Sequence, residues 1–500
     1  MAAANYIKHP NPLYKDNLLV EGMGYPFSKA KVQQKTGIAF EGALDLTDVP
    51  SDLHGYYLRS SILNLFSMHV TQDEMVEVYE VIRQAIEIGY LGRNPSSYTQ
   101  QRILTAIEKD SDTSLKSLHL KRLNLLESSF TYLISGLSGR GKSTMVKQAL
   151  KLINQRIEHD YTGADEAGNS TKFDHVQITY IYLEHHERAG QKAFLIEILR
   201  AVDDAVFEEG EGLEVRRYAY KHRNSDIKDL ILSVRKALVK HHVGLLIIDE
   251  AQNFSKSSKD MKINTNEKIS MRYVEELVNS LGLSTIFVGT FSALELFSKE
   301  MTITRRTIKA GSLNLASCPL DSSFWIRLCD ALFNSVILPG GQDEQGLLRQ
   351  KLFELTAGIP AIAVSVVQAT LRFLSYFESE VKGLTIDALE YVFGKQFATL
   401  SGPISAIING EYYRYEDTKP MALLEMVDPY AKEPNMENLH HVEKQAQDLV
   451  ATYNQTSPKM LQGTVQVATP SATNPYEVES VEATQGLSPE NLMSIIEGKS

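Results

Sequence analysis

Eight consecutive residues have the types and the spacing that hold a triphosphate. Gly136-Leu-Ser-Gly-Arg-Gly-Lys-Ser143 fits the pattern G-x-x-x-x-G-K-[ST]. In such a loop, backbone N–H groups bind phosphate oxygens, the lysine reaches the terminal phosphates and the last hydroxyl coordinates Mg²⁺. The sequence therefore predicts a site for ATP and Mg²⁺. The residues predicted to bind the nucleotide are Gly136, Leu137, Ser138, Gly139, Arg140, Gly141, Lys142, Ser143 and Thr144, and Ser143 is also predicted to be a ligand of Mg²⁺.

Two carboxylates farther along the chain supply the second half of this chemistry. Leu245-Leu-Ile-Ile-Asp249-Glu250 is an apolar run that ends in two acidic residues. Open α/β sheets carry their chemistry at the carboxyl ends of their strands, so a strand here delivers both groups to one place. We assign Asp249 to the shell of Mg²⁺ and Glu250 to polarisation of the attacking water. Thr290 follows a later apolar run and is assigned to hold that water or sense the γ-phosphate.

Two adjacent arginines, Arg305 and Arg306, come after the Gly-Thr strand end. If this pair acts as an arginine finger, it completes the nucleotide site of a neighbouring subunit. The alternative is a pair of surface arginines without a role in catalysis. The pairs His185-His186 and His241-His242 lack the helical or finger spacing of zinc sites, so we expect no zinc there.

The order of apolar runs predicts the elements that position these residues. From about residue 129, short apolar runs alternate with amphipathic helices, which is typical of a parallel sheet wrapped by helices. The predicted fold class is therefore α/β, a P-loop nucleotide-binding core followed after residue 320 by a small all-helical lid. The predicted strands are 130–134, 176–183, 243–248, 285–288 and 313–316, and the predicted helices are 142–155, 189–206, 324–333, 345–355, 361–377 and 386–397.

Composition predicts the segments outside this core. Scattered prolines indicate an irregular arm that leads into a small helical region, where Thr71 and Glu74 form a capping box for a helix ending near Gly89. The last fifty residues are rich in Ser, Thr, Pro, Gln and Asn and are predicted to be largely disordered. They end in a short segment, 488–497, expected to fold only against a partner, and the alternative is a frayed C-terminus without a function. The predicted domains are 1–100, 101–318, 319–400, 401–450 and 451–500.

Composition also limits the class of protein. The 500 residues are 43% hydrophobic and 23% charged, as in ordinary globular domains. No apolar stretch approaches the roughly 18–20 residues of a membrane span, so we expect a cytoplasmic protein with no membrane partner. Cys318 and Cys329 are too few for a disulfide framework and predict buried thiols. The formal net charge of −11 means that any contact with DNA requires a local basic face.

Two basic segments qualify as such a face. One precedes the Asp-Glu strand and the other is the polar stretch that follows it. Lys and Arg on loops bind phosphates without reading sequence, and the alternative is a solvated charged surface. The residues predicted to contact DNA are Arg216, Arg217, Tyr218, Lys221, Arg223, Lys256, Lys259 and Lys262.

Taken in order, these motifs and a lid containing Ala357-Gly-Ile-Pro360 resemble an AAA+ ATPase. More narrowly, the chain resembles the TnsC-like regulators of DNA transposition, through Gly89-Tyr-Leu-Gly-Arg-Asn-Pro95, Gly244-Leu-Leu-Ile-Ile-Asp-Glu-Ala-Gln252 and Val288-Gly-Thr290. The resemblance covers residues 50–400. One departure is Ala361-Ile-Ala-Val-Ser365, which lacks the lid cation that such proteins place on the γ-phosphate.

The resemblance implies an ATP-bound homo-oligomeric ring or filament, such as a heptamer, on double-stranded DNA. It also implies a target selector of the TniQ or TnsD type and a transposase of the TnsA and TnsB type, in systems that include CRISPR-associated transposons. Two alternatives stay open. The acidic composition favours a signalling or defence ATPase that acts on protein partners. A replication initiator or helicase loader is less favoured, since 400–450 carries no strong helix-turn-helix signature.

Overall fold

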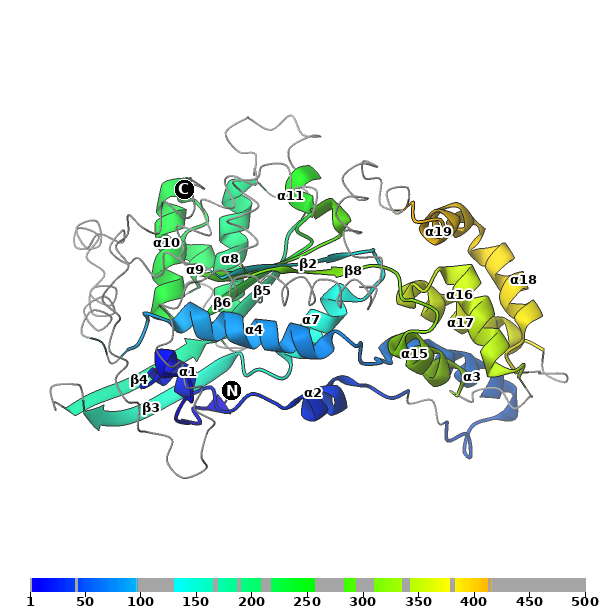
Figure 1. Ribbon diagram of the computed structural model, residues 1–500, viewed down its shortest axis with the longest axis horizontal. Coiled ribbons are helices and arrows are strands. Elements are labelled where there is room, and N and C mark those ends of the chain that lie inside the picture. Colours follow the sequence, from blue (N-terminus) through cyan, green and yellow to red (C-terminus); the bar gives the residue numbers. More distant parts are fainter. Residues whose placement is uncertain are drawn as a thin grey trace, which may run out of the picture. The chain divides into compact units, whose positions relative to one another are not determined.

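In the computed structural model, five of the described strands form one parallel sheet (Figure 1). The strand order is β5-β6-β7-β2-β8, and every neighbouring pair is parallel. The structure describes residues 2–40, 44–95, 97, 130–164, 170–186, 190–207, 217–256, 283–293, 310–334, 342–377, 383–411 and 415. The strands of this sheet are β2 (Thr131–Gly136), β5 (Tyr180–Glu184), β6 (Leu245–Asp249), β7 (Ser284–Val288) and β8 (Ser312–Leu315).

Helices cover both faces of the sheet, which confirms the predicted α/β class (Figure 1). Successive side chains of a strand point to opposite faces, so each strand contributes to two cores. Ile247 packs in one core with α4 and α7, whereas Ile248 packs in the other with α8 and α10. The helices around the sheet are α4 (Met75–Tyr90), α7 (Lys142–Leu150), α8 (Gln191–Val206), α9 (Tyr218–Lys221), α10 (Ile227–Lys240) and α11 (Asn253–Lys256).

After β8 the described residues form helical elements only, as predicted for the lid. No single described helix is long and apolar enough to cross a membrane. The helices α16 (Gln345–Thr356) and α17 (Pro360–Leu374) would be long and apolar enough only if taken as one span, and they meet at a bend of 116°. Cys318 and Cys329 are buried free thiols, and burial raises the pKa of Cys318 to about 11. The lid elements are α15 (Ser323–Phe333), α16 (Gln345–Thr356), α17 (Pro360–Leu374), α18 (Ile386–Gln396), η5 (Ala398–Leu400) and α19 (Ser401–Ile408).

An antiparallel hairpin precedes β5 and corrects the predicted strand 176–183. The hairpin consists of β3 (Arg156–Ala164) and β4 (Ser170–Ile178), and β1 (Ala2–Ala3) pairs in parallel with β3. The predicted strand is therefore two strands in different sheets, and the predicted helix 142–155 ends at Leu150. The alternation of the hairpin was missed because one of its faces carries His159, His175 and Gln177 instead of aliphatic residues.

The N-terminal segment packs against the same core as α4. Leu19, Val20 and Val32 are fully buried in that core. The predicted capping box is wrong: α4 begins with Glu74 at the N-cap position and without a side-chain cap, because the Glu74 carboxylate pairs with Arg140. The elements of this segment are η1 (Pro12–Tyr14), α1 (Leu18–Glu21), α2 (Lys29–Thr36), η2 (Ser51–Leu53), α3 (His54–Ile62) and η3 (Leu63–Ser67).

The Gly-Tyr-Leu-Gly-Arg-Asn-Pro element fastens the end of α4 to the sheet. A Cβ on Gly89 would lie 2.1 Å from the carbonyl oxygen of Gly244, so only glycine permits this approach. The Tyr90 hydroxyl donates to the Ile178 carbonyl at 3.1 Å, and Arg93 Nη1 donates to the Val243 carbonyl at 2.7 Å. The element thus sets the position of α4 beneath the strands that carry the predicted site.

Buried imidazoles between the hairpin and α10 predict a loss of stability in mild acid. Burial lowers the pKa of His241 to about 4 and that of His242 well below its ordinary value. The unfolded chain binds protons on these groups below about pH 6.5 while the folded chain does not, so stability falls as the pH drops. For His241 this difference costs about 1 kcal/mol between about pH 7.5 and 5.5.

Urea unfolding at these two pH values measures the effect. The variant His241→Phe, which has no titrating group at this position, is expected to lose less stability than wild type on acidification, by about 1 kcal/mol. Equal pH dependence in the two proteins would contradict the assignment to this imidazole.

Candidate functional site

The predicted phosphate loop lies between β2 and α7. β2 ends at Gly136, and α7 begins at Lys142 with Gly141 at its N-cap position. Gly141 has φ +94, and a Cβ there would lie 2.4 Å from Nε2 of Gln72. The glycine therefore allows both the left-handed turn and the close contact that bring the chain into the helix.

The loop, the two carboxylates and Thr290 line one pocket of about 490 Å³, which is within the usual range for small-molecule sites. Their convergence follows from the sheet order, because β2, β6 and β7 are neighbours and end at the same edge. The pocket lining also includes Gln252, which was not among the residues predicted for the site. Lining residues from the loop and the start of α7 are Ser138, Gly139, Gly141, Lys142, Ser143 and Thr144.

Lys142 is buried at the base of this pocket. Its ammonium group donates to the carbonyl oxygens of Gly136 and Leu137, each at 2.9 Å. An ammonium group is attracted more strongly to anionic phosphate oxygens than to neutral carbonyl oxygens. A bound triphosphate therefore offers this lysine better acceptors than the loop does.

Asp249 and Ser143 provide oxygen ligands of the kind that Mg²⁺ prefers. The Asp249 carboxylate accepts from the Tyr182 hydroxyl at 2.5 Å and from the backbone N–H of Glu250 at 2.8 Å. Burial, and then the bond to Asp249, raise the pKa of Tyr182 above its ordinary value. Tyr182 thus orients Asp249 from the neighbouring strand, a role that the sequence analysis missed. A bound Mg²⁺ would neutralise charge on the phosphates during transfer.

Glu250 is exposed in the pocket and has a left-handed backbone, with φ +57. This region is uncommon for residues other than glycine, and such strain is often found at functional sites. The Glu250 carboxylate accepts a short hydrogen bond from the side-chain amide of Gln252. Oε1 of that amide accepts from the backbone N–H of Thr290 at 3.1 Å. The signal for Gln252 was its place in the Asp-Glu-Ala-Gln run.

The side chain of Arg140 is directed away from this pocket. Its guanidinium group donates to Gln72 Oε1 at 2.7 Å, to Glu74 Oε1 at 3.1 Å and to the Ala316 carbonyl at 3.0 Å. Arg140 therefore ties the loop to the start of α4 and to the end of β8. Any contact that this residue makes with phosphate comes from its backbone, and the Leu137 side chain is likewise buried outside the pocket.

The described residues of the lid contact the loop through uncharged groups. The backbone N–H of Ala361 donates to the Gly139 carbonyl at 3.2 Å, and the Tyr415 hydroxyl donates to the Ser138 carbonyl at 3.2 Å. Among the described residues that line the pocket, Lys142 is the only basic one. The departure noted at 361–365 thus falls at the nucleotide pocket itself.

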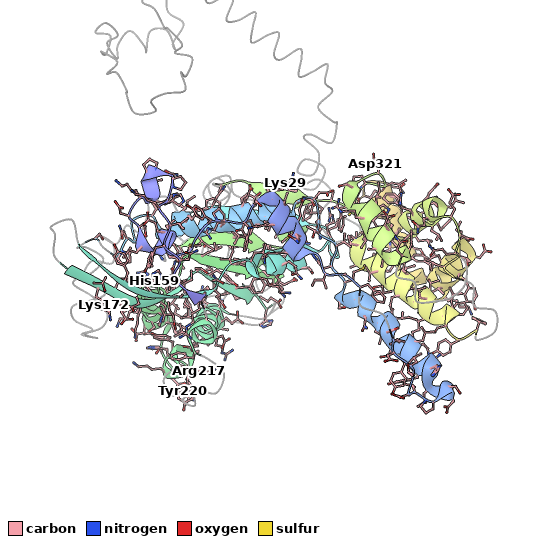
Figure 2. All side chains as sticks on the ribbon, turned by 90° about the horizontal axis from the view of Figure 1, so that it is seen from below. Lys29, His159, Lys172, Arg217, Tyr220 and Asp321 are labelled. Atoms are coloured by element: carbon pink, nitrogen blue, oxygen red, sulfur yellow. The ribbon has the colours of Figure 1, made fainter. Side chains whose placement is uncertain are left out.

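The predicted DNA-contacting residues divide into described and undescribed groups. Figure 2 shows Arg217 and Tyr220 close together at the lower edge of the view, where α9 lies. Lys221 and Arg223 are exposed beside them, whereas the Tyr218 hydroxyl bonds Nε2 of His241 at 2.9 Å and is not directed outward. Arg216, Lys259, Lys262, Arg305 and Arg306, together with the side chain of Lys256, lie outside the described residues. Within the part of the chain that the structure describes, no cluster of three or more His, Cys, Asp or Glu residues forms a metal site.

Comparison with known families agrees with this geometry. Residues 128–297 match the AAA domain family. The chain contains an AAA-type ATPase domain. The match includes the loop, Asp249, Glu250 and Thr290, so it supports ATP as the ligand and ATP hydrolysis as the reaction of the AAA domain.

A Walker-type ATPase of Pyrococcus abyssi is similar in structure at 14% identity, with a TM-score of 0.35, over 60% of this chain and 75% of that chain. No curated protein sequence matches the chain.

Proposed function

We propose that this protein is an ATP-dependent DNA-binding regulator of the TnsC kind, which oligomerises on target DNA and couples target selection to transposase recruitment. The observation that carries the DNA-binding part is the basic cluster at α9, defined as Arg217, Lys221 and Arg223. The AAA domain supplies the nucleotide dependence, and the sequence resemblance supplies the transposition context.

The basic cluster lies on α9 and on the residues that flank it, and the core holds this short helix in place. The Asp203 carboxylate, 2% exposed, accepts from the backbone N–H groups of Tyr218 at 2.8 Å and Ala219 at 2.9 Å. These bonds fix the first turn of α9 against α8. The Arg223 guanidinium lies 4.2 Å from the ring centroid of Tyr220, itself 39% exposed. Cations held on a fixed element suit the phosphate backbone of duplex DNA.

Binding of random-sequence duplex DNA with and without a non-hydrolysable ATP analogue tests the proposal. We expect tight binding only with the analogue, little preference for sequence, and a steep loss of affinity between about 50 and 200 mM salt. Absence of DNA binding at low salt in both nucleotide states would overturn it.

Alanine at all three positions of the basic cluster is expected to weaken DNA binding and flatten its salt dependence. Each phosphate contact contributes about 0.9 to the slope of log affinity against log salt, so the slope should fall by about 2 to 3. A charge-matched control removes three lid cations, Lys351, Arg372 and Lys395, and should leave the slope unchanged. Equal slopes for both triple variants would remove α9 from the interface.

The partners belong to the same proposal. The oligomer is a ring or filament in which Arg305 and Arg306 complete the neighbouring subunit's nucleotide site. A target selector of the TniQ or TnsD type and a transposase of the TnsA and TnsB type bind this assembly, the latter through the C-terminal segment 488–497. Mass measurement of the protein on DNA, with each partner added in turn, tests these assignments.

Exposed aromatic side chains favour a second candidate, an ATPase that acts on protein partners. Tyr56 and Tyr57 of α3 and Phe66 of η3 are 62%, 40% and 58% exposed. The Arg59 guanidinium lies 4.5 Å from the ring centroid of Tyr376, which is exposed at the end of α17. Contiguous exposed apolar surface commonly marks a protein interface. ATP turnover that responds to a protein partner and not to DNA would favour this candidate.

A further inference from the structure

Gln252 bridges the ends of two strands at the nucleotide pocket. The side-chain Nε2 of Gln252 donates to Glu250 Oε2, and its Oε1 accepts from the backbone N–H of Thr290. Gln252 is 7% exposed, and a Cβ on Gly289 would lie 2.7 Å from its Oε1. The amide is therefore packed into a space that leaves it little freedom to move.

The turn that carries Gln252 is itself anchored on two sides. The backbone N–H of Ala251 donates to the Val288 carbonyl at 2.9 Å, and that of Asn253 donates to the Glu250 carbonyl at 2.9 Å. The Asn253 side chain donates to the His185 carbonyl at 2.8 Å. These bonds hold the turn against β7 and against the end of β5, so the Gln252 amide starts from a fixed base.

We propose that Gln252 is a positioning residue for ATP hydrolysis, which sets the Glu250 carboxylate and ties it to the Thr290 strand end. Glu250 is exposed and has a long side chain, so without a partner its carboxylate samples several rotamers. A general base must lie within about 3 Å of the water it polarises. The bond from Gln252 occupies Oε2 and leaves Oε1 as the acceptor for water. A shift of Thr290 on contact with phosphate is passed to Glu250 through one rigid amide.

This inference rests on the ATPase activity of the AAA domain and goes beyond the residues already assigned to it. Lys142 and Asp249 share the pocket with Glu250 and carry the other charges near it. The two bonds of Gln252 that form the bridge go to Glu250 and to the Thr290 backbone, so its proposed role differs from binding of the phosphates and the metal.

The variant Gln252→Met keeps the length of the side chain and removes both hydrogen bonds. We expect kcat to fall about 10- to 100-fold, while KM and the affinity for a non-hydrolysable ATP analogue change by less than about twofold. In a Glu250→Gln background the same change should add no further loss, because Gln252 acts through Glu250. Additive losses, or a kcat within about twofold of wild type, would overturn the proposal.

Amide hydrogen exchange tests the bridge without any turnover. The Thr290 N–H should exchange faster in Gln252→Met than in wild type when no nucleotide is present, since it loses its acceptor. Gln252→Glu keeps that acceptor and loses the donor to Glu250, so Thr290 should stay protected while kcat still falls. Unchanged exchange at Thr290 in Gln252→Met would contradict the bridge.

A matched control separates these effects from the loss of a buried amide. Gln368 on α17 is also 7% exposed. The variant Gln368→Met should leave kcat and the exchange rate of the Thr290 N–H unchanged. Equal effects of the two methionine variants would overturn the specific role of Gln252. If the wild type itself did not hydrolyse ATP, the proposed activity would fail while the exchange experiment still tested the bridge.

Discussion

Replacing Lys142 with alanine is expected to abolish tight ATP binding. The ammonium group is buried at the base of the pocket between two loop carbonyls, and it is the only basic group among the described residues of the lining. Truncating one partner of a buried charge pair costs about 2 to 5 kcal/mol, so affinity should fall by at least about 30-fold. Calorimetric titration with a non-hydrolysable analogue measures the change.

Lys147→Ala is the matched control for this prediction. Lys147 lies on the same helix, is 48% exposed and pairs with Glu184 at 2.7 Å on the surface. Exposed pairs contribute at most about 1 kcal/mol, and this pair lies outside the pocket lining. ATP affinity should therefore stay near that of wild type. If Lys142→Ala bound ATP as tightly as Lys147→Ala does, the assignment of the phosphate loop would be wrong.

The substitution Glu250→Gln is expected to keep ATP binding and slow hydrolysis by about 10²-fold or more. A glutamine is nearly isosteric with Glu250, but it does not accept a proton from water. Because the phosphate contacts of the loop are unchanged, the affinity for the analogue should stay within about twofold of wild type. Single-turnover hydrolysis and analogue binding, measured on the same preparation, separate the two steps.

Glu184→Gln provides the control for the carboxylate. Glu184 ends the neighbouring strand β5 and pairs in register with Asp249, but it does not line the pocket. Its replacement should leave turnover close to wild type. Hydrolysis by Glu250→Gln at the wild-type rate would show that a group other than Glu250 polarises the water.

The nucleotide site could be predicted from sequence because its parts are local patterns. A glycine-rich loop must follow a strand and open a helix to bind phosphate, and residues 130–143 carry all three features in order. The β6 strand is an unbroken apolar run because it is buried on both faces, so its end and its two carboxylates were visible. The lid helices were visible for a similar reason, since their apolar residues recur at helical spacing.

The predictions of secondary structure were wrong where polar residues occupy buried positions. His159 of β3 and Gln177 of β4 are buried, as is His242, which packs against the hairpin. The sequence of β3 and β4 therefore lacks the apolar alternation that predicts a strand. Thr71 and Glu74 have the spacing of a capping box, yet tertiary contacts with Gln33 and Arg140 take their side chains. In both cases, tertiary contacts decided the structure against the local sequence pattern.

By itself, the sequence predicted which residues contact phosphate, metal and water, because each belongs to a motif whose chemistry depends on neighbours in the chain. Only the tertiary structure decided what holds those residues in place. Tyr182 reaches Asp249 from the adjacent strand, Gln252 joins Glu250 to Thr290, and Arg140 turns from the pocket toward α4. These partners lie on different elements that only the parallel sheet brings together, and no spacing along the chain encodes hydrogen bonds of that kind.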